Sequence, residues 1–295
     1  MLGCKMRLIL LLICSSTFLI SVAEASVFTD NFQIYFGDWN VKYPGRVKGN
    51  TVILGLTNSS GSGFRSKIPF LFGRLTMKIK LPANDSAGTV TSYYMASTFK
   101  KWCELDFEFL GNRSGQPYIL QTNVFVEGKG EREQRIFLWF DPTTRYHEYG
   151  IVWNQNLVIF IVDNIPIRVF HNQKNTTGQL YLDYQPMYIW SSLFDGDSWA
   201  TRGGLEKINW SKQPFQAYYT SFNIANSCQV TNCTGVNNCY KQLYQSSYGN
   251  KSLQLTSTQI TQLRWVRRRW IIYDYCTDLQ RWSGVVPVEC VKNRP

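Results

Sequence analysis

The stretch ELDFEFLG at residues 104–111 alternates acidic and apolar side chains. Residues two apart in a β-strand share one face. Glu104, Asp106 and Glu108 therefore line one face of a predicted strand, and the apolar residues between them point into a core. This period of two indicates a sheet with one buried and one accessible face.

Similar runs recur between Val27 and about Phe222, separated by Gly, Asn, Pro and Asp, and we find no convincing amphipathic helix among them. The alternation is clearest at 74–81. Many short antiparallel strands predict an all-β fold, either a two-sheet sandwich or a jelly roll. The predicted strands are 74–81, 89–96, 104–110, 118–126, 135–140, 157–162, 165–170 and 187–193.

The character of the chain changes near residue 223, where polar residues and cysteines become frequent. Thr256 to Gln259 has the pattern of a capping box, which predicts a helix that ends near Ile272. We therefore divide the chain into an N-terminal segment (1–25), a β-domain (26–222) and a C-terminal extension (223–295); the arguments below make these a signal peptide, a catalytic domain and a segment stapled by disulfides.

The first residues predict secretion, because Lys5 and Arg7 precede an apolar run over 8–20 and Ala23-Glu24-Ala25 provides a cleavage signal. A membrane anchor is the alternative, but it needs about 18 or more apolar residues, and this run is shorter. We expect a secreted, extracellular protein with no membrane contact after cleavage.

The chain carries a net charge of +11, and its densest basic run contains Arg264 and Arg267 to Arg269. Secretion argues against nucleic acid as the partner. A solvated helix face is the first interpretation of these arginines. Weak attraction to acidic wall polysaccharide is the alternative.

Six cysteines follow the predicted cleavage site, and an oxidising compartment favours disulfides over zinc, since no Cys-x-x-Cys pair occurs. We predict the pairs Cys276–Cys290 and Cys228–Cys239. Because connectivity cannot be read from sequence, a Cys228–Cys233 pair stays open. Asn-x-Ser/Thr sequons begin at Asn58, Asn84, Asn112, Asn175, Asn209, Asn232 and Asn250.

Three acids on one strand face repel one another, and a glycosidase uses such crowding to separate the pKa values of its carboxyls. A retaining enzyme places two carboxyls about 5–5.5 Å apart. Glu104 and Glu108 are long enough to lean together over the shorter Asp106, so we favour retention. An exposed acidic edge or a calcium site is the alternative, and the many aromatic residues favour sugar binding.

The chain resembles the plant xyloglucan endotransglucosylase/hydrolases of glycoside hydrolase family sixteen over almost its whole length. The resemblance implies a jelly-roll with a long substrate cleft, a retaining mechanism, xyloglucan as donor and no cofactor or metal. It rests on 104–112 with GQPY at 115–118, QTN at 121–123, REQR at 132–135, LWFDP at 138–142, WATRGGLEK at 199–207 and YDYCTD at 273–278.

Carried over by position, the resemblance makes Glu104 the nucleophile, Asp106 its helper and Glu108 the acid/base, with a glycan on Asn112. It also implies a monomer in the cell wall and apoplast, active in cell wall biogenesis on xyloglucan polymers and oligosaccharides. The implied sugar contacts are Gln121, Thr122, Asn123, Glu131, Arg132, Glu133, Ser198, Trp199, Gly203 and Arg281.

Two departures from the family pattern lie close to this chemistry. Trp102-Cys103 stands where the family usually has His-Asp, and Ser198 replaces the Asp of an Asp-Trp pair. We expect Cys103 to be a buried free thiol on the apolar side of the strand, with a redox-sensitive or metal-binding thiol as the alternative.

Three functions remain open on the sequence alone: transfer to a sugar acceptor, hydrolysis by the same residues, and carbohydrate binding without turnover. The complete set of three acids disfavours the last. The short stretch after Trp199 lacks the extra loop associated with hydrolytic members of the family, which favours transfer.

Overall fold

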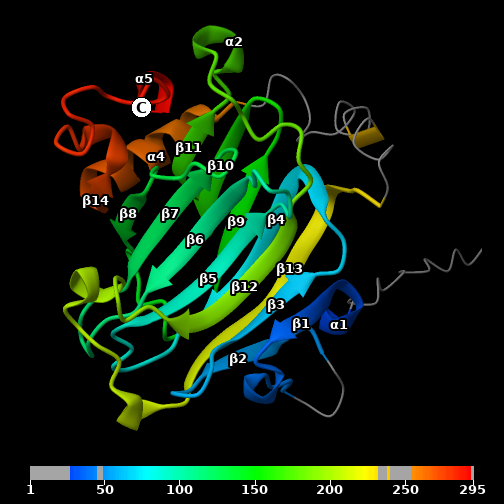
Figure 1. Ribbon diagram of the computed structural model, residues 1–295, viewed down its shortest axis with the longest axis vertical. Coiled ribbons are helices and arrows are strands. Elements are labelled where there is room, and N and C mark those ends of the chain that lie inside the picture. Colours follow the sequence, from blue (N-terminus) through cyan, green and yellow to red (C-terminus); the bar gives the residue numbers. More distant parts are fainter. Residues whose placement is uncertain (1–26, 45–48, 232–237, 240–253, 294–295) are drawn as a thin grey trace, which may run out of the picture.

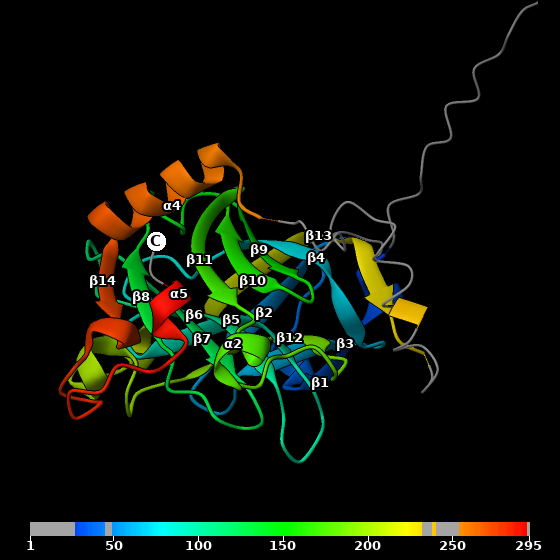
Figure 2. The same cartoon turned by 90° about the horizontal axis from the view of Figure 1, so that it is seen from above.

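The computed structural model describes residues 27–44, 49–231, 238–239 and 254–293. Within them, two antiparallel sheets stack face to face (Figures 1 and 2). The larger sheet has the strand order β1-β3-β12-β5-β6-β7-β8-β14, and the smaller has the order β11-β10-β9-β4-β13-β2. The predicted all-β sandwich is confirmed.

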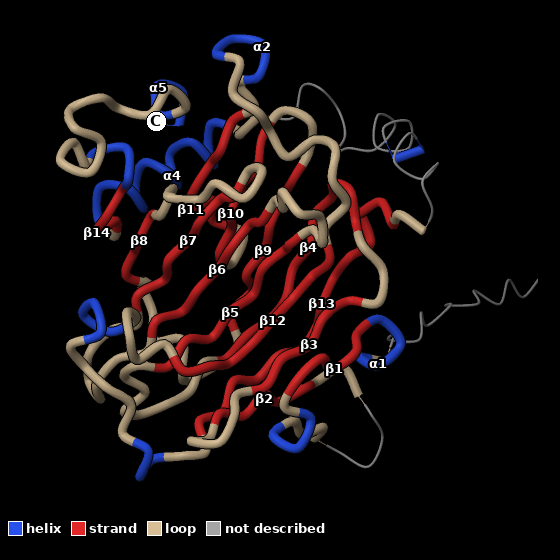
Figure 3. The backbone as a smooth tube through the Cα atoms, viewed as in Figure 1, coloured by secondary structure: helices blue, strands red, loops and turns tan. Residues whose placement is uncertain are grey.

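The strands fill the centre of the molecule, and short helices lie at its periphery (Figure 3). The strands are β1 Phe32–Phe36, β2 Val52–Leu56, β3 Ser62–Ser66, β4 Phe70–Lys80, β5 Thr89–Ala96, β6 Glu104–Leu110, β7 Ile119–Phe125, β8 Gln134–Phe137, β9 His147–Trp153, β10 Leu157–Val162, β11 Ile165–His171, β12 Tyr188–Asp195, β13 Phe215–Gln229 and β14 Ile271–Asp274. The α-helices whose full extent is described are α1 Phe28–Asn31, α2 Lys174–Thr177, α4 Ser257–Arg269 and α5 Cys290–Asn293, and 3-10 turns lie at Asp38–Asn40, Thr201–Gly204, Trp210–Lys212 and Tyr275–Thr277.

The core lies between the two sheets, and the acid strand β6 contributes its apolar side to it. Leu105, Phe107 and Phe109 are fully buried. Phe107 packs edge to face on Phe160 of the smaller sheet, with ring centroids 5.2 Å apart, and Phe109 packs on Tyr149 at 4.6 Å. The predicted alternation of β6 is therefore confirmed, and it fixes the acids on the opposite face of the larger sheet.

The predicted strands all exist, and those at 89–96, 104–110 and 157–162 have the observed bounds. The run predicted at 135–140 was too long, because β8 ends at Phe137, whose backbone N–H donates to the Trp270 carbonyl. Strands that the sequence did not reveal are β1, β2, β3, β9, β13 and β14.

The C-terminal extension adds to both sheets. Helix α4 begins at the predicted capping box, where Thr256 accepts from the Gln259 N–H, and it covers the outer face of the smaller sheet through Leu263 (Figure 2). The helix ends at Arg269 and not near Ile272, because the following residues pair with β8 as strand β14. The predicted division at residue 222 stays a prediction, although β13 runs across it.

Both predicted disulfides, Cys228–Cys239 and Cys276–Cys290, are present. Cys233, the predicted signal segment and the sequons at Asn232 and Asn250 lie outside the described residues. Among the residues that are described, no helix is both long and apolar enough to cross a bilayer.

Candidate active site

The three acids lie near the middle of the larger sheet, because β6 is paired on both sides. Glu104, Asp106 and Glu108 stand opposite Ala96, Tyr94 and Ser92 of β5, and opposite Phe125, Asn123 and Gln121 of β7. We call this side of the sheet the acid face. Asp106 is only 5 % exposed, whereas the two glutamates are half-buried and accessible from the acid face.

The central carboxyl is the one least able to ionise. Burial raises the pKa of Asp106 well above its ordinary value, and the charges of Glu104 and Glu108 raise it further. Burial also raises the pKa of Glu104, but hydrogen bonds with Asp106 and the Trp102 side chain oppose that rise. Of these two carboxyls, Asp106 therefore holds the proton, and it donates a hydrogen bond to the ionised Glu104.

Glu108 is held by a chain of hydrogen bonds from the other side. Gln121 donates from Nε2 to Glu108 Oε2 at 2.7 Å, and Arg135 of β8 donates from Nε to Gln121 Oε1 at 2.6 Å. Burial raises the pKa of Glu108, while the Gln121 hydrogen bond and the Arg135 charge lower it. This arrangement fixes the rotamer of Glu108, and the net effect of its surroundings raises its pKa above the ordinary value.

A buried cation lies behind the acids, inside the sandwich. Arg168 of β11 is 1 % exposed and donates to the carbonyl and hydroxyl oxygens of Thr122, both at 2.9 Å. In the described part of the chain it forms no ion pair. Its charge opposes the burial-driven rise in the pKa of Asp106, so Arg168 offsets part of the negative charge from the core side.

Aromatic side chains occupy the β5 and β12 side of the acid face, and we call Tyr94, Tyr188 and Trp190 the aromatic flank. Trp190 stands opposite Tyr94 in register, and their rings are stacked with centroids 6.2 Å apart. Tyr188 packs against Trp190 at 6.3 Å. Sequence reasoning missed these residues, and only the register that puts Trp190, Tyr94 and Asp106 in one row reveals them.

Polar and charged residues occupy the β7, β8 and β14 side, and we call Gln121, Glu133, Arg135, Tyr273 and Arg281 the charged flank. Arg281 donates to Glu133 at 2.7 Å and to the Tyr273 hydroxyl at 3.0 Å. The Arg135 guanidinium lies over the Tyr273 ring, 5.6 Å from its centroid. The C-terminal extension thus completes this flank, which contains three of the predicted sugar contacts, Gln121, Glu133 and Arg281.

Comparison with known proteins agrees with this geometry. The family model for glycosyl hydrolases family 16 matches residues 28–212, and the model for the xyloglucan endo-transglycosylase (XET) C-terminus matches residues 244–290. The chain is 49 % identical to "Xyloglucan endotransglucosylase/hydrolase protein 15" of Arabidopsis thaliana over 92 % of both chains. It is 51 % identical to "Xyloglucan endotransglucosylase protein 2" of Diospyros kaki, over 83 % of this chain and 82 % of that protein.

The chain belongs to the xyloglucan endotransglucosylase/hydrolase family. Solved structures of the same fold include the β-glucanase of Bacillus licheniformis, with a TM-score of 0.52 at 22 % identity over 68 % of this chain and 92 % of that one. Another is the Crh5 transglycosylase in complex with NAG, with a TM-score of 0.53 at 21 % identity over 73 % and 88 %. At these identities the likeness shows the fold alone.

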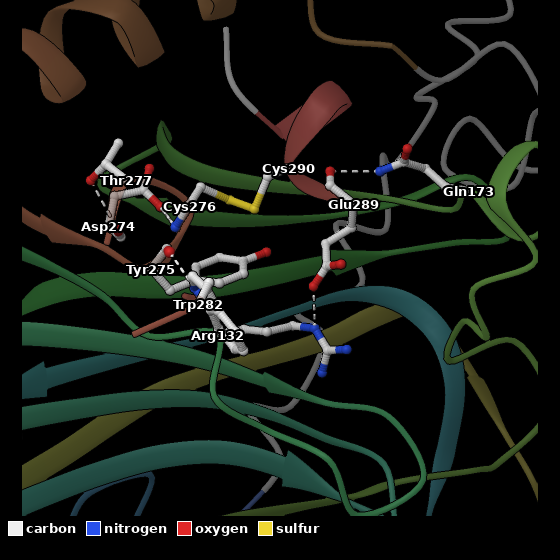
Figure 4. Close-up of a disulfide and its surroundings, with 9 residues drawn as sticks. All are labelled: Arg132, Gln173, Asp274, Tyr275, Cys276, Thr277, Trp282, Glu289 and Cys290. Atoms are coloured by element: carbon white, nitrogen blue, oxygen red, sulfur yellow. Dashed lines mark hydrogen bonds and ion pairs between the residues drawn. A yellow bond between two sulfur atoms is a disulfide. The ribbon is translucent and has the colours of Figure 1, made fainter. Parts of the chain in front are cut away.

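Two of the residues that the family resemblance implies as sugar contacts are bound by other parts of the chain in this structure. Thr122 lies opposite Phe107 in register, on the core side of the sheet, where Arg168 binds its hydroxyl, so its side chain does not reach the acid face. Arg132 is engaged by Glu289, with Nε donating to Oε1 at 2.8 Å beside the Cys276–Cys290 disulfide (Figure 4). Strict alternation along β7 would have excluded Thr122.

The remaining predicted contacts are distributed over three segments. Gln121 and Asn123 share the acid face, although the Asn123 side-chain oxygen accepts from the Arg132 N–H at 3.0 Å. Glu131 lies 3.9 Å from Arg281 at the charged flank. Ser198, Trp199 and Gly203 follow β12, and Trp199 packs against Val90 and Leu110 beyond the Glu108 end of β6.

The sequon Asn112 lies two residues after the end of β6. It is partly exposed, and its Nδ2 donates to the Pro117 carbonyl at 3.0 Å. It lines a hollow of about 490 Å³ together with Asn84, another sequon, so both asparagines open onto the same space.

Trp102 and Cys103, which replace the family's His-Asp, point in opposite directions. Cys103 is a buried free thiol, as predicted, and burial raises its pKa. Trp102 is 37 % exposed, stacks on Phe125 with centroids 6.1 Å apart and hydrogen-bonds to Glu104. The indole therefore supplies a donor to the first glutamate. Among the described residues, no group of three or more His, Cys, Asp or Glu side chains is arranged to hold a metal ion.

Proposed function

We propose that this protein is a retaining, endo-acting glycosyl-transferring enzyme, a xyloglucan:xyloglucosyl transferase. It cleaves the β-1,4-glucan backbone of a donor xyloglucan and passes the fragment to another xyloglucan chain. The observation that carries the proposal is the pair of accessible glutamates on one face, separated by a buried Asp106 that favours the protonated state. The names of the relatives support the choice of substrate.

In the first half-reaction, ionised Glu104 attacks the anomeric carbon and forms a glycosyl ester. Protonated Glu108 gives its proton to the departing glycosidic oxygen, so the C–O bond breaks and a free chain end leaves. Asp106 donates to Glu104 and holds the attacking oxygen in place. Burial raises the pKa of Glu108, which keeps its proton available.

In the second half-reaction, the Glu108 carboxylate removes the proton from an acceptor hydroxyl. The hydroxyl oxygen attacks the anomeric carbon, and the ester bond to Glu104 breaks with net retention of configuration. If water takes the acceptor's place, the glycosyl ester on Glu104 is hydrolysed and the donor chain is cut without transfer. The aromatic flank offers ring faces on which sugars pack, and a sugar that occupies the acceptor position excludes water.

The proposal includes contacts and a location. Gln121, Asn123, Glu131, Glu133, Ser198, Trp199, Gly203 and Arg281 are proposed to contact substrate, and Asn112 to carry a glycan. We propose a secreted monomer of the cell wall and apoplast, because the N-terminal segment has the pattern of a signal peptide and two disulfides are present.

The test is incubation with xyloglucan, with and without labelled xyloglucan oligosaccharide. Transfer predicts that label enters polymer and that polymer size falls only when the oligosaccharide is present, without new reducing ends. New reducing ends in the absence of oligosaccharide would instead establish an endohydrolase. Binding to xyloglucan without either change would establish a carbohydrate-binding wall protein.

A further inference from the structure

The outward side of helix α4 carries an unusual concentration of positive charge. Arg264, Arg268 and Arg269 are exposed, and Trp265 lies between them, 38 % exposed. At 3.6 residues per turn these four side chains share one arc of the helix, opposite the buried Leu263 and Val266. We call these four residues the arginine–tryptophan surface.

Among the residues that the structure describes, no acidic side chain pairs with this surface. The sequence has no Asp or Glu between Glu206 and Asp274. In the described part of the chain, the three arginines take part in no ion pair. The sheet residues beneath α4, such as Val152, Ile159 and Val169, are apolar. The positive potential therefore projects outward into solvent.

Helix stability alone does not account for the pattern. Cations in the last turn favour the negative end of the helix dipole, and this explains Arg268 and Arg269. Arg264 precedes the last turn, and an exposed tryptophan adds nothing to the dipole. Trp265 is fixed by other rings, with centroids 5.2 Å from Trp139 and 5.9 Å from Trp270, so it presents a rigid aromatic surface among the arginines.

We propose that the arginine–tryptophan surface binds an acidic polysaccharide of the polyuronate type. Guanidinium groups pair with carboxylates through two parallel hydrogen bonds, and a rigid indole accepts the apolar face of a sugar ring. A polyuronate supplies both groups in regular alternation. The choice of a polysaccharide over other polyanions rests on the proposed extracellular location.

The position of the surface separates it from the acid face. Helix α4 covers the outer side of the smaller sheet, whereas the acids line the opposite side of the larger sheet (Figure 2). A charged polymer held at α4 leaves the acid face open to a neutral glucan. The two sites can therefore be tested independently on one protein.

The experiment measures binding of the whole mature protein to immobilised polygalacturonate over a series of salt concentrations. The triple variant R264Q/R268Q/R269Q should bind about tenfold more weakly or worse, since each arginine near an anionic surface adds to affinity. Trp265→Ala should lose about threefold. Fully methyl-esterified polymer, which lacks carboxylates, should not retain the wild type.

The matched control is K42Q/K100Q/K212Q, which removes the same charge from three exposed lysines outside α4. It should keep the wild-type affinity for polygalacturonate. If its affinity falls as much as that of the arginine variant, net charge alone explains the binding and the proposal is overturned. Tighter binding to phosphatidylserine vesicles than to polygalacturonate, lost in the arginine variant, would also overturn it. Transfer activity on xyloglucan, measured for every variant, reports separately on the acid face.

Discussion

The two flanks of β6 differ in the kind of side chain that they present to the same acids. The aromatic flank offers ring surfaces, with Trp190 stacked on Tyr94. The charged flank reaches Glu108 through Gln121 and Arg135. We propose a division of work, in which the aromatic flank supplies ring contacts to sugar and the charged flank, besides its polar sugar contacts, determines when Glu108 holds its proton.

The largest effect is expected at the first acid between the flanks. Glu104→Gln should lower turnover by about 10⁴-fold or more, because the nucleophile is lost. The half-buried side chain lies outside the core, so the circular dichroism spectrum and melting temperature should stay close to wild type. Glu148→Gln, a carboxylate on β9 that is paired with Arg74, is the control and should retain turnover. Comparable loss in both variants would contradict the assignment.

Glu108→Gln should lower turnover by about 10²- to 10⁴-fold, since protonation of the leaving oxygen is lost. The loss in kcat/KM, which reports the first half-reaction, should be greatest for substrates with poor leaving groups and small for activated aryl glycosides. Kinetics on a series of aryl glycosides checks this. A loss that is independent of the leaving group would show that Glu108 is not the acid.

On the aromatic flank, Trp190→Ala should raise KM for xyloglucan by about tenfold and leave the pH profile unchanged, because ring contact is lost and no acid loses a partner. Steady-state kinetics between pH 4 and 9 measures both quantities. Trp190→Phe, which keeps a ring, should recover most of the affinity. A displaced pH profile in Trp190→Ala would break the division between the flanks.

On the charged flank, Arg135→Gln should move the alkaline limb of the pH profile to higher pH, with a smaller change in KM. The Arg135 charge lowers the pKa of Glu108, so its removal raises that pKa. Glu108 must be protonated in the first step, and activity should therefore persist to higher pH. An unmoved alkaline limb, or one displaced to lower pH, would show that this flank does not control the proton on Glu108.

Local sequence patterns predicted much of the secondary structure around these flanks. The alternation in 104–110 correctly predicted three acids on one face, because side chains two apart in a strand point to the same side. The capping box correctly predicted the start of α4. The predicted end of that helix was wrong, because Ile271 and Tyr273 pair with β8. The β8 residues lie more than 130 positions earlier in the chain, so no local pattern reveals this pairing.

The site was predicted less completely, because a row of side chains depends on register between strands. Trp190 lies within a predicted strand, but its place beside Tyr94 and Asp106 follows only from the pairing of β12, β5 and β6. Arg281 and Glu133 meet across the sequence with no local signal, and only the family resemblance pointed to them. The same resemblance included Thr122, which the strand alternation excludes.

The most direct test of the account is to find the residue that carries the glycosyl group. Glu108→Gln, which slows release of the intermediate, is incubated with an activated xyloglucan aryl glycoside, digested and analysed by peptide mass spectrometry. We predict a glycosyl ester on Glu104 that disappears in Glu104→Gln/Glu108→Gln and that reacts only slowly with added oligosaccharide, because the base is absent. An ester on another residue, or an inverted product with no ester, would contradict the proposed retaining mechanism.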